Sequence, residues 1–125
     1  MGRAGTTDSD DQPPAPFEVG RWLVDPATDQ ITLDRKPVKL EPRTMRLLVT
    51  LAERPGTVYT SDALLDAVWP GVVVTGQSLY QAIGELRSVL KADTQTGDFI
   101  ATVPRKGYRL IAPVARNGRT AMVRA

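Results

Sequence analysis

The sequence predicts a mixed α+β fold in which a four-stranded antiparallel sheet is followed by three helices and a C-terminal β-hairpin. Two observations support this order. Apolar and polar residues alternate in short runs over residues 17–40 and again over 98–113, as in strands with one buried face. Between residues 42 and 91 the apolar spacing changes to three and four, which is the spacing of amphipathic helices.

The 125 residues are enough for one domain with a single core. Residues 1–16 are polar, acidic and proline-rich, and we expect a disordered tail there. We expect the folded domain over residues 17–114 and a basic tail, or the start of a linker, over 115–125. Since no apolar run approaches the roughly 20 residues of a membrane helix and no secretory signal is present, we expect a cytoplasmic protein.

The composition argues against catalysis. The chain has no cysteine and no histidine, so it lacks thiol nucleophiles, disulfides, and the commonest general base and metal ligand. Neither a P-loop nor a dinucleotide-binding fingerprint is present. We therefore expect no enzymatic activity, no metal, no cofactor and no small-molecule substrate.

The predicted sheet is formed by short runs that Asp, Pro and Gly separate. Its apolar side chains are Phe17, Val19, Trp22, Val24, Ile31, Leu33, Val38 and Leu40. The first helix follows in EPRTMRLLVTLAERPG (41–56), where Pro42 suits the first turn because its missing N–H has no partner to lose. The second helix is DALLDAVW (62–69), which Thr60 or Ser61 can cap.

The third helix spans residues 76–91 and has one narrow apolar stripe. Its apolar residues Leu79, Ile83, Leu86 and Leu90 are spaced by four, three and four. The opposite face carries amides and hydroxyls, which either contact a ligand or are simply hydrated. Gly84 lies on this face and weakens the helix by about 1 kcal/mol relative to alanine. Either a close approach of a partner or a plain packing role can explain it.

The hairpin IATVPRKGYRLIAPV (100–114) places two cations, Arg105 and Lys106, at its tip, where Pro104 and Gly107 are expected to shape the turn. Residues 105–125 contain six Lys or Arg and no acid, although the net charge of the chain is only +2. Such a basic segment attracts phosphate polyanions or is merely a solvated tail.

Two short helices, a third helix across a turn and a cationic hairpin form the layout of a winged helix-turn-helix. In that layout the third helix enters the DNA major groove, whose base edges are distinguishable. The hairpin is the wing, and its tip reaches the adjacent minor groove or backbone. A phosphate-lined narrow groove favours two neighbouring cations that would otherwise repel each other.

In these segments the chain resembles the OmpR/PhoB-type winged-helix domains, and most of all the CadC- and ToxR-like transcription regulators. The resemblance rests on residues 40–56, 61–71, 74–90 and 100–114, which lie in order at the family's spacings. It implies a bacterial-type regulator that binds specific double-stranded DNA. It also implies binding as a homodimer or in tandem on half-sites, and a contact with RNA polymerase through Val72–Gly76.

The resemblance further assigns individual positions. The recognition-helix positions are Gln77, Ser78, Tyr80, Gln81, Ala82, Glu85, Arg87 and Ser88. The wing positions are Thr102, Arg105, Lys106 and Tyr108, and Ser61 and Trp69 match phosphate contacts. For Arg87 a salt bridge is the alternative to phosphate binding, and for Trp69 and Tyr108 the alternative is packing.

Several features depart from the family pattern. Many relatives have a cation at Glu85, so a carboxylate there suggests a changed base preference. Relatives also carry a receiver domain before this domain, or a membrane helix and sensor after it. We therefore expect part of a longer regulator, its cytoplasmic part if that regulator is membrane-anchored, with a stand-alone regulator as the alternative. The rival function is a winged helix that docks onto another protein, such as RNA polymerase, with little affinity for DNA.

Overall fold

The structure is a computed structural model that describes residues 15–116 and 119–121. Most of the expected N-terminal tail, and residues 117–118 and 122–125 of the expected C-terminal tail, lie outside the described residues. None of the helices within the described ranges is long and apolar enough to cross a membrane.

Within the described residues, the larger sheet has six strands rather than the predicted four. It contains β1 (Phe17–Val19), β2 (Trp22–Asp25), β3 (Gln30–Leu33), β4 (Lys36–Lys39), β8 (Val114–Arg116) and β9 (Arg119–Ala121). The strand order is β4-β3-β2-β1-β8-β9, and all neighbours are antiparallel. The segment from residue 115 on, expected as a tail, thus contributes to two strands of the sheet. Strand β8 pairs with β1 through Glu18–Ala115 and Val19–Val114, and β9 pairs with β8.

Three helices follow the first four strands, at nearly the predicted positions. They are α2 (Pro42–Glu53), α3 (Ser61–Val68) and α4 (Gly76–Leu90). Pro42 lies at the start of α2, and the Thr60 hydroxyl caps α3 by accepting a hydrogen bond from the Ala63 N–H at 3.0 Å. The expected order of an antiparallel sheet followed by three helices is therefore confirmed.

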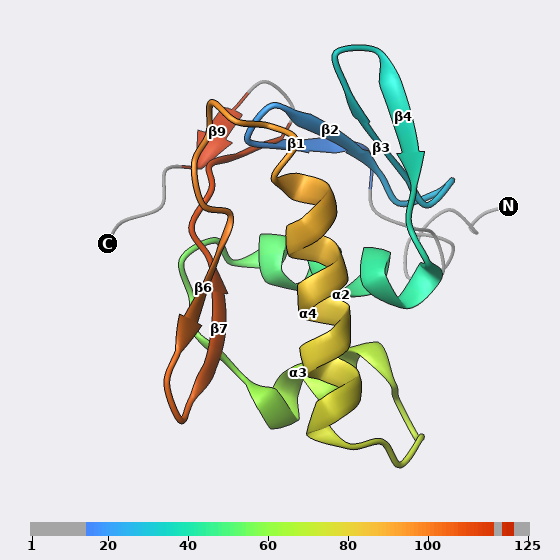
Figure 1. The fold of residues 1–125 in the computed structure, drawn as a ribbon, viewed down its shortest axis with the longest axis vertical. Coiled ribbons are helices and arrows are strands. Elements are labelled where there is room, and N and C mark those ends of the chain that lie inside the picture. The colour runs from blue at the N-terminus through green and yellow to red at the C-terminus, as the bar shows by residue number, and fades with distance from the viewer. Residues whose placement is uncertain (1–14, 117–118, 122–125) are drawn as a thin grey trace, which may run out of the picture.

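The smaller sheet is the predicted hairpin with one added strand. Strands β6 (Ile100–Val103) and β7 (Gly107–Leu110) form the hairpin, and β5 (Tyr59–Thr60) pairs with β7 in the order β5-β7-β6. Figure 1 shows this hairpin beside α4, with its tip near the end of the molecule farthest from the larger sheet. The hairpin is called the wing below.

One core joins the inner face of the larger sheet to α2, α3 and α4. Of the eight apolar side chains predicted for the sheet, six are buried, and Leu33 and Val38 are partly buried against them. The predicted stripe of α4 is buried throughout, with each of its four side chains at most 1% exposed. The Trp22 indole Nε1–H donates to the Leu90 carbonyl at 3.1 Å, so the larger sheet holds the C-terminal end of α4.

Asp93 secures the loop after α4 to the turn between β1 and β2. Its side chain is buried and accepts hydrogen bonds from the backbone N–H groups of Arg21, Gln95 and Thr96, and from the Thr96 hydroxyl. Burial by itself would raise the pKa of Asp93, but these hydrogen bonds outweigh it and hold the pKa below its usual value. The ionised carboxylate therefore stabilises the junction of helix and sheet.

Candidate nucleic-acid interface

The exposed face of α4 is polar and carries no cation at its centre. Gln77, Gln81, Gly84, Glu85 and Ser88 are all exposed, while the buried stripe faces the core. Tyr80 is 66% exposed on the same helix. Amide groups can donate and accept hydrogen bonds at the same time, which is the capacity needed to read the edge of an adenine base.

Ala82 does not belong to this exposed face. It is 5% exposed and packs in the core, because its position on the helix brings it beside the apolar stripe. The expectation that Ala82 faces DNA is therefore corrected. Ser78 is half-buried at the edge of the face.

Gly84 is exposed at the centre of the face, and the structure favours one of its two explanations. A Cβ atom built on Gly84 would have no atom of a described residue within 4 Å beyond its own helix. Packing therefore gives no reason for glycine at this position. The missing side chain leaves the backbone of α4 open to close approach from outside.

The wing tip is a tight turn with a strained corner. The Lys106 N–H donates to the Val103 carbonyl at 3.0 Å, which closes a four-residue turn with Pro104 and Arg105 at its centre. Arg105 has φ = 65°. Proline followed by a residue of positive φ matches a type II turn, in which glycine or asparagine normally takes the second position. An arginine there costs about 1 kcal/mol of backbone strain, so the turn is less stable with this side chain than it would be with glycine.

Gly107 has a different role from the predicted one, since it is the first residue of β7 and does not lie at the corner. A Cβ atom on Gly107 would lie 1.8 Å from the Tyr59 carbonyl oxygen. Glycine is required because the backbone of β5 lies this close to β7, with which it pairs. The Ser61 N–H also donates to the Lys106 carbonyl at 3.2 Å, so the start of α3 is tied directly to the turn.

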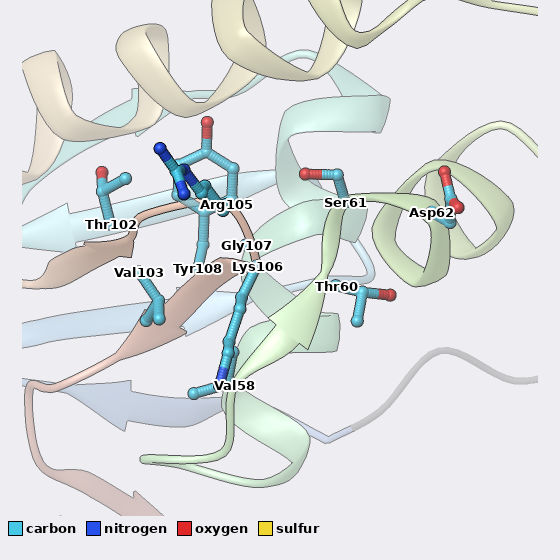
Figure 2. Close-up of a pocket in the computed structure, with 10 residues that line it drawn as sticks. All are labelled: Val58, Thr60, Ser61, Asp62, Thr102, Val103, Arg105, Lys106, Gly107 and Tyr108. Carbon is cyan, nitrogen blue, oxygen red and sulfur yellow. The ribbon is translucent and has the colours of Figure 1, made fainter.

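The two cations at the tip point to opposite sides of the wing. Figure 2 shows Arg105 on the side of Thr102 and Tyr108, toward α4, whereas Lys106 extends the other way, toward Val58. Together with the start of α3, these residues border an open groove of about 750 Å³ that Ser61 also lines. Asp62 lines it as well and adds a negative charge to an otherwise basic groove. Only Arg105 among the tip cations shares a side with α4.

Arg87 is not exposed in the way a simple phosphate ligand would be. It is half-buried, and its Nη2 donates to the Ile100 carbonyl at 3.0 Å and to the Thr102 hydroxyl at 2.8 Å. Its guanidinium also lies 6.0 Å from the centre of the Tyr108 ring. None of these three contacts is the salt bridge considered as the alternative. Tyr108 is half-buried and directly opposite Thr102 across the wing strands, as expected for a packing role.

Trp69 lies in the core rather than on the surface. It is 7% exposed, and the Arg43 guanidinium lies 5.9 Å from its ring centre. This burial favours packing over a phosphate contact. The exposed cation at this place is Arg43, which was not among the predicted contact residues. The signal for it was a basic residue in the first turn of a helix, where an acid is the usual preference.

The basic C-terminal segment separates into residues with different roles. Arg116 is structural, since its Nη2 donates to the Ala52 carbonyl at 3.1 Å and its guanidinium lies 4.2 Å from the centre of the Phe17 ring. Arg109 is half-buried in β7. The side chains of Arg119 and Arg124 fall outside the described side chains. Of the basic segment, Arg105 and Lys106 at the wing tip are exposed.

Comparison with known proteins identifies the family of this arrangement. Residues 35–110 match the family described as "Transcriptional regulatory protein, C terminal". The chain is 44% identical over 97 residues to the transcriptional activator CadC of Escherichia coli. That alignment covers 77% of this chain and 19% of the activator, so the chain spans only a fifth of this relative.

Solved structures agree with the sequence match. The DNA-binding domain of E. coli CadC superposes with a TM-score of 0.75 at 41% identity, over 82% of this chain and 97% of that one. The DNA-binding domain of Klebsiella pneumoniae RstA, solved in complex with the RstA box, gives a TM-score of 0.63 at 32% identity, over 78% and 97% of the two chains. The chain therefore belongs to the family of C-terminal domains of transcriptional regulatory proteins, and it is a winged-helix DNA-binding domain of the OmpR/PhoB type similar to CadC.

Proposed function

We propose that this domain binds a specific sequence of double-stranded DNA, with α4 in the major groove and the wing against the adjacent minor groove and backbone. The observation that carries the proposal is the placement of Arg105. Its side chain lies on the α4 side of the wing, so one surface combines the neutral amide face of α4 with a projecting cation.

In this proposal, α4 and the wing have different roles. Gln77 and Gln81 are suited to base edges, and Glu85 can accept a hydrogen bond from cytosine N4. Tyr80, Ser78 and Ser88 complete the contact surface of the helix. Since this surface has no central cation, Arg105 supplies most of the attraction to phosphate, with Ser61 and Thr102 as hydroxyl donors.

The test compares the two tip cations, which have equal charge and are adjacent in sequence. Fluorescence anisotropy with a duplex selected from a random pool is measured over a range of salt concentrations. We expect Arg105→Ala to weaken binding more than Lys106→Ala, and to lower the salt slope by about 0.9 if it loses one phosphate contact. Equal effects of both substitutions would contradict the assignment to the α4 side. Absence of salt-sensitive binding by the unsubstituted chain would contradict DNA binding itself.

A second contact, with RNA polymerase, is supported by the loop between α3 and α4. Val73 is 100% exposed and Val72 is 50% exposed, although valine is usually buried. Val73→Ser should leave DNA affinity unchanged and lower transcription from a promoter that carries the selected site. Unchanged transcription in a reconstituted assay would rule out this contact. If the chain does not bind DNA, protein docking through this loop becomes the leading function.

We further propose that two copies bind tandem half-sites. With a lightly charged recognition helix, one copy has few phosphate contacts, so its affinity alone is modest. Sedimentation of the chain with duplexes that carry one or two copies of the selected site tests this. Binding of two chains to the double site, with higher affinity than to the single site, is the expected result.

A further inference from the structure

Arg87 links α4 to the edge of the wing. In the strand order β5-β7-β6, β6 is an outer strand, so backbone pairing holds it on one side only. Arg87 approaches with hydrogen bonds to the carbonyl of Ile100 and the hydroxyl of Thr102, both on β6. The remaining contact is with Tyr108 on β7, so one guanidinium reaches both strands of the hairpin.

These contacts lead directly to the wing tip. Thr102 is followed at once by Val103, whose carbonyl closes the turn that holds Arg105. The other tie to the turn comes from Ser61 at the start of α3. The turn is thus held between two helices, from α3 through backbone and from α4 through a single side chain.

We propose that Arg87 is a positioning residue, which acts on DNA by fixing the wing relative to α4 and so placing Arg105, rather than by binding a phosphate itself. This inference rests on the proposed DNA-binding function. Its physical basis is that an arginine guanidinium is planar with fixed donor directions, so it holds the strand in one orientation better than a flexible ammonium group would.

The first experiment is a double-mutant cycle between Arg87 and Arg105, using anisotropy with the duplex selected by the unsubstituted chain. Arg87→Met should weaken binding by about 3- to 30-fold in the parent chain, in the range of coupling between contacting groups. In the Arg105→Ala background it should weaken binding less than about twofold, because the group that Arg87 positions is already gone.

A direct phosphate contact predicts the opposite pattern. The cost of Arg87→Met would then persist in the Arg105→Ala background, and the salt slope would fall by about 0.9 in both backgrounds. Either result would overturn the positioning role. Lys91→Met is the matched control, since it removes an exposed cation four positions later, directly after the end of α4, and reports the general effect of lost charge.

The second experiment does not depend on DNA. Hydrogen exchange of the DNA-free chain should be faster at the β6 amides in Arg87→Met, and also in Thr102→Val, which removes one acceptor with little change in volume. Exchange equal to that of the parent chain would overturn the proposal. Circular dichroism melting checks that each variant is folded. If the parent chain binds no duplex, the proposed function fails, and hydrogen exchange still decides whether Arg87 holds the wing.

Discussion

At the scale of single residues, Gly84 lowers the stability of α4, although no packing contact of the fold requires a glycine there. The glycine lies in the middle of α4, and an added Cβ would have no described neighbour within 4 Å outside the helix. Gly84→Ala should therefore raise the free energy of unfolding by about 1 kcal/mol, which corresponds to roughly 4–8 °C in Tm for a domain of this size. Thermal melting measures this gain, and an unchanged or lower Tm would contradict it.

The same substitution at Gly107 should have the opposite effect. A Cβ there would lie 1.8 Å from the Tyr59 carbonyl oxygen, a backbone atom that cannot move aside without breaking the pairing of β5 with β7. We expect Gly107→Ala to lower the free energy of unfolding by about 3 kcal/mol, as for severe overpacking. Urea unfolding of the two alanine variants side by side provides the comparison. If Gly107→Ala left the free energy of unfolding unchanged, β5 would have to be able to move away from β7.

At the scale of elements, the helices could be predicted closely because each is defined by its own periodic pattern. The spacing of Leu79, Ile83, Leu86 and Leu90 determined both the extent and the buried side of α4. Strands β5 and β8 could not be predicted as sheet members, since no strand that is adjacent in sequence pairs with them in a hairpin that the sequence marks. Their pairing depends on partners far away in the chain, Tyr108 for β5 and Glu18 for β8.

The sequence was sufficient to predict which elements form the candidate interface, but not the directions in which their side chains point. The polar face of α4 and the cationic tip of the wing follow from the sequence alone. The opposite directions of Arg105 and Lys106 do not, because a turn interrupts the alternation that orients side chains in strands. The contacts of Arg87 could not be predicted either. One of its acceptors is the backbone carbonyl of Ile100, and every residue type has a backbone carbonyl.

At the scale of the whole molecule, Asp93 makes stability depend on pH. The pKa of Asp93 is lower in the folded chain than its ordinary value of 3.8, so the unfolded chain binds the proton more readily. The stabilisation is thus present above this ordinary value and is lost as the pH falls through the lower, folded value. Asp93→Asn should destabilise the domain at pH 7, and progressively less as the pH falls below 3.8. Melting temperatures measured across this range would contradict the assignment if the two curves stayed parallel.

Arg116 connects strand β8 to the core through contacts with α2 and β1. Its contacts reach the Ala52 carbonyl near the end of α2 and the Phe17 ring in β1. Arg116→Ala should lower the free energy of unfolding by about 1–2 kcal/mol through loss of the hydrogen bond and the cation–π contact. DNA affinity at a temperature where both proteins are folded should be little changed. A large loss of affinity without loss of stability would instead place Arg116 in the interface.

The pairing of β1 with β8 also determines when the domain can be completed during synthesis. Glu18 and Ala115 are neighbours in the sheet although 97 positions separate them in the chain. At about 5–20 residues per second, the ribosome needs several seconds to translate the intervening segment. During that interval the first hairpins have an unpaired edge at β1. Contacts between such distant residues also slow folding, so the nascent chain carries this open edge until β8 emerges from the ribosome.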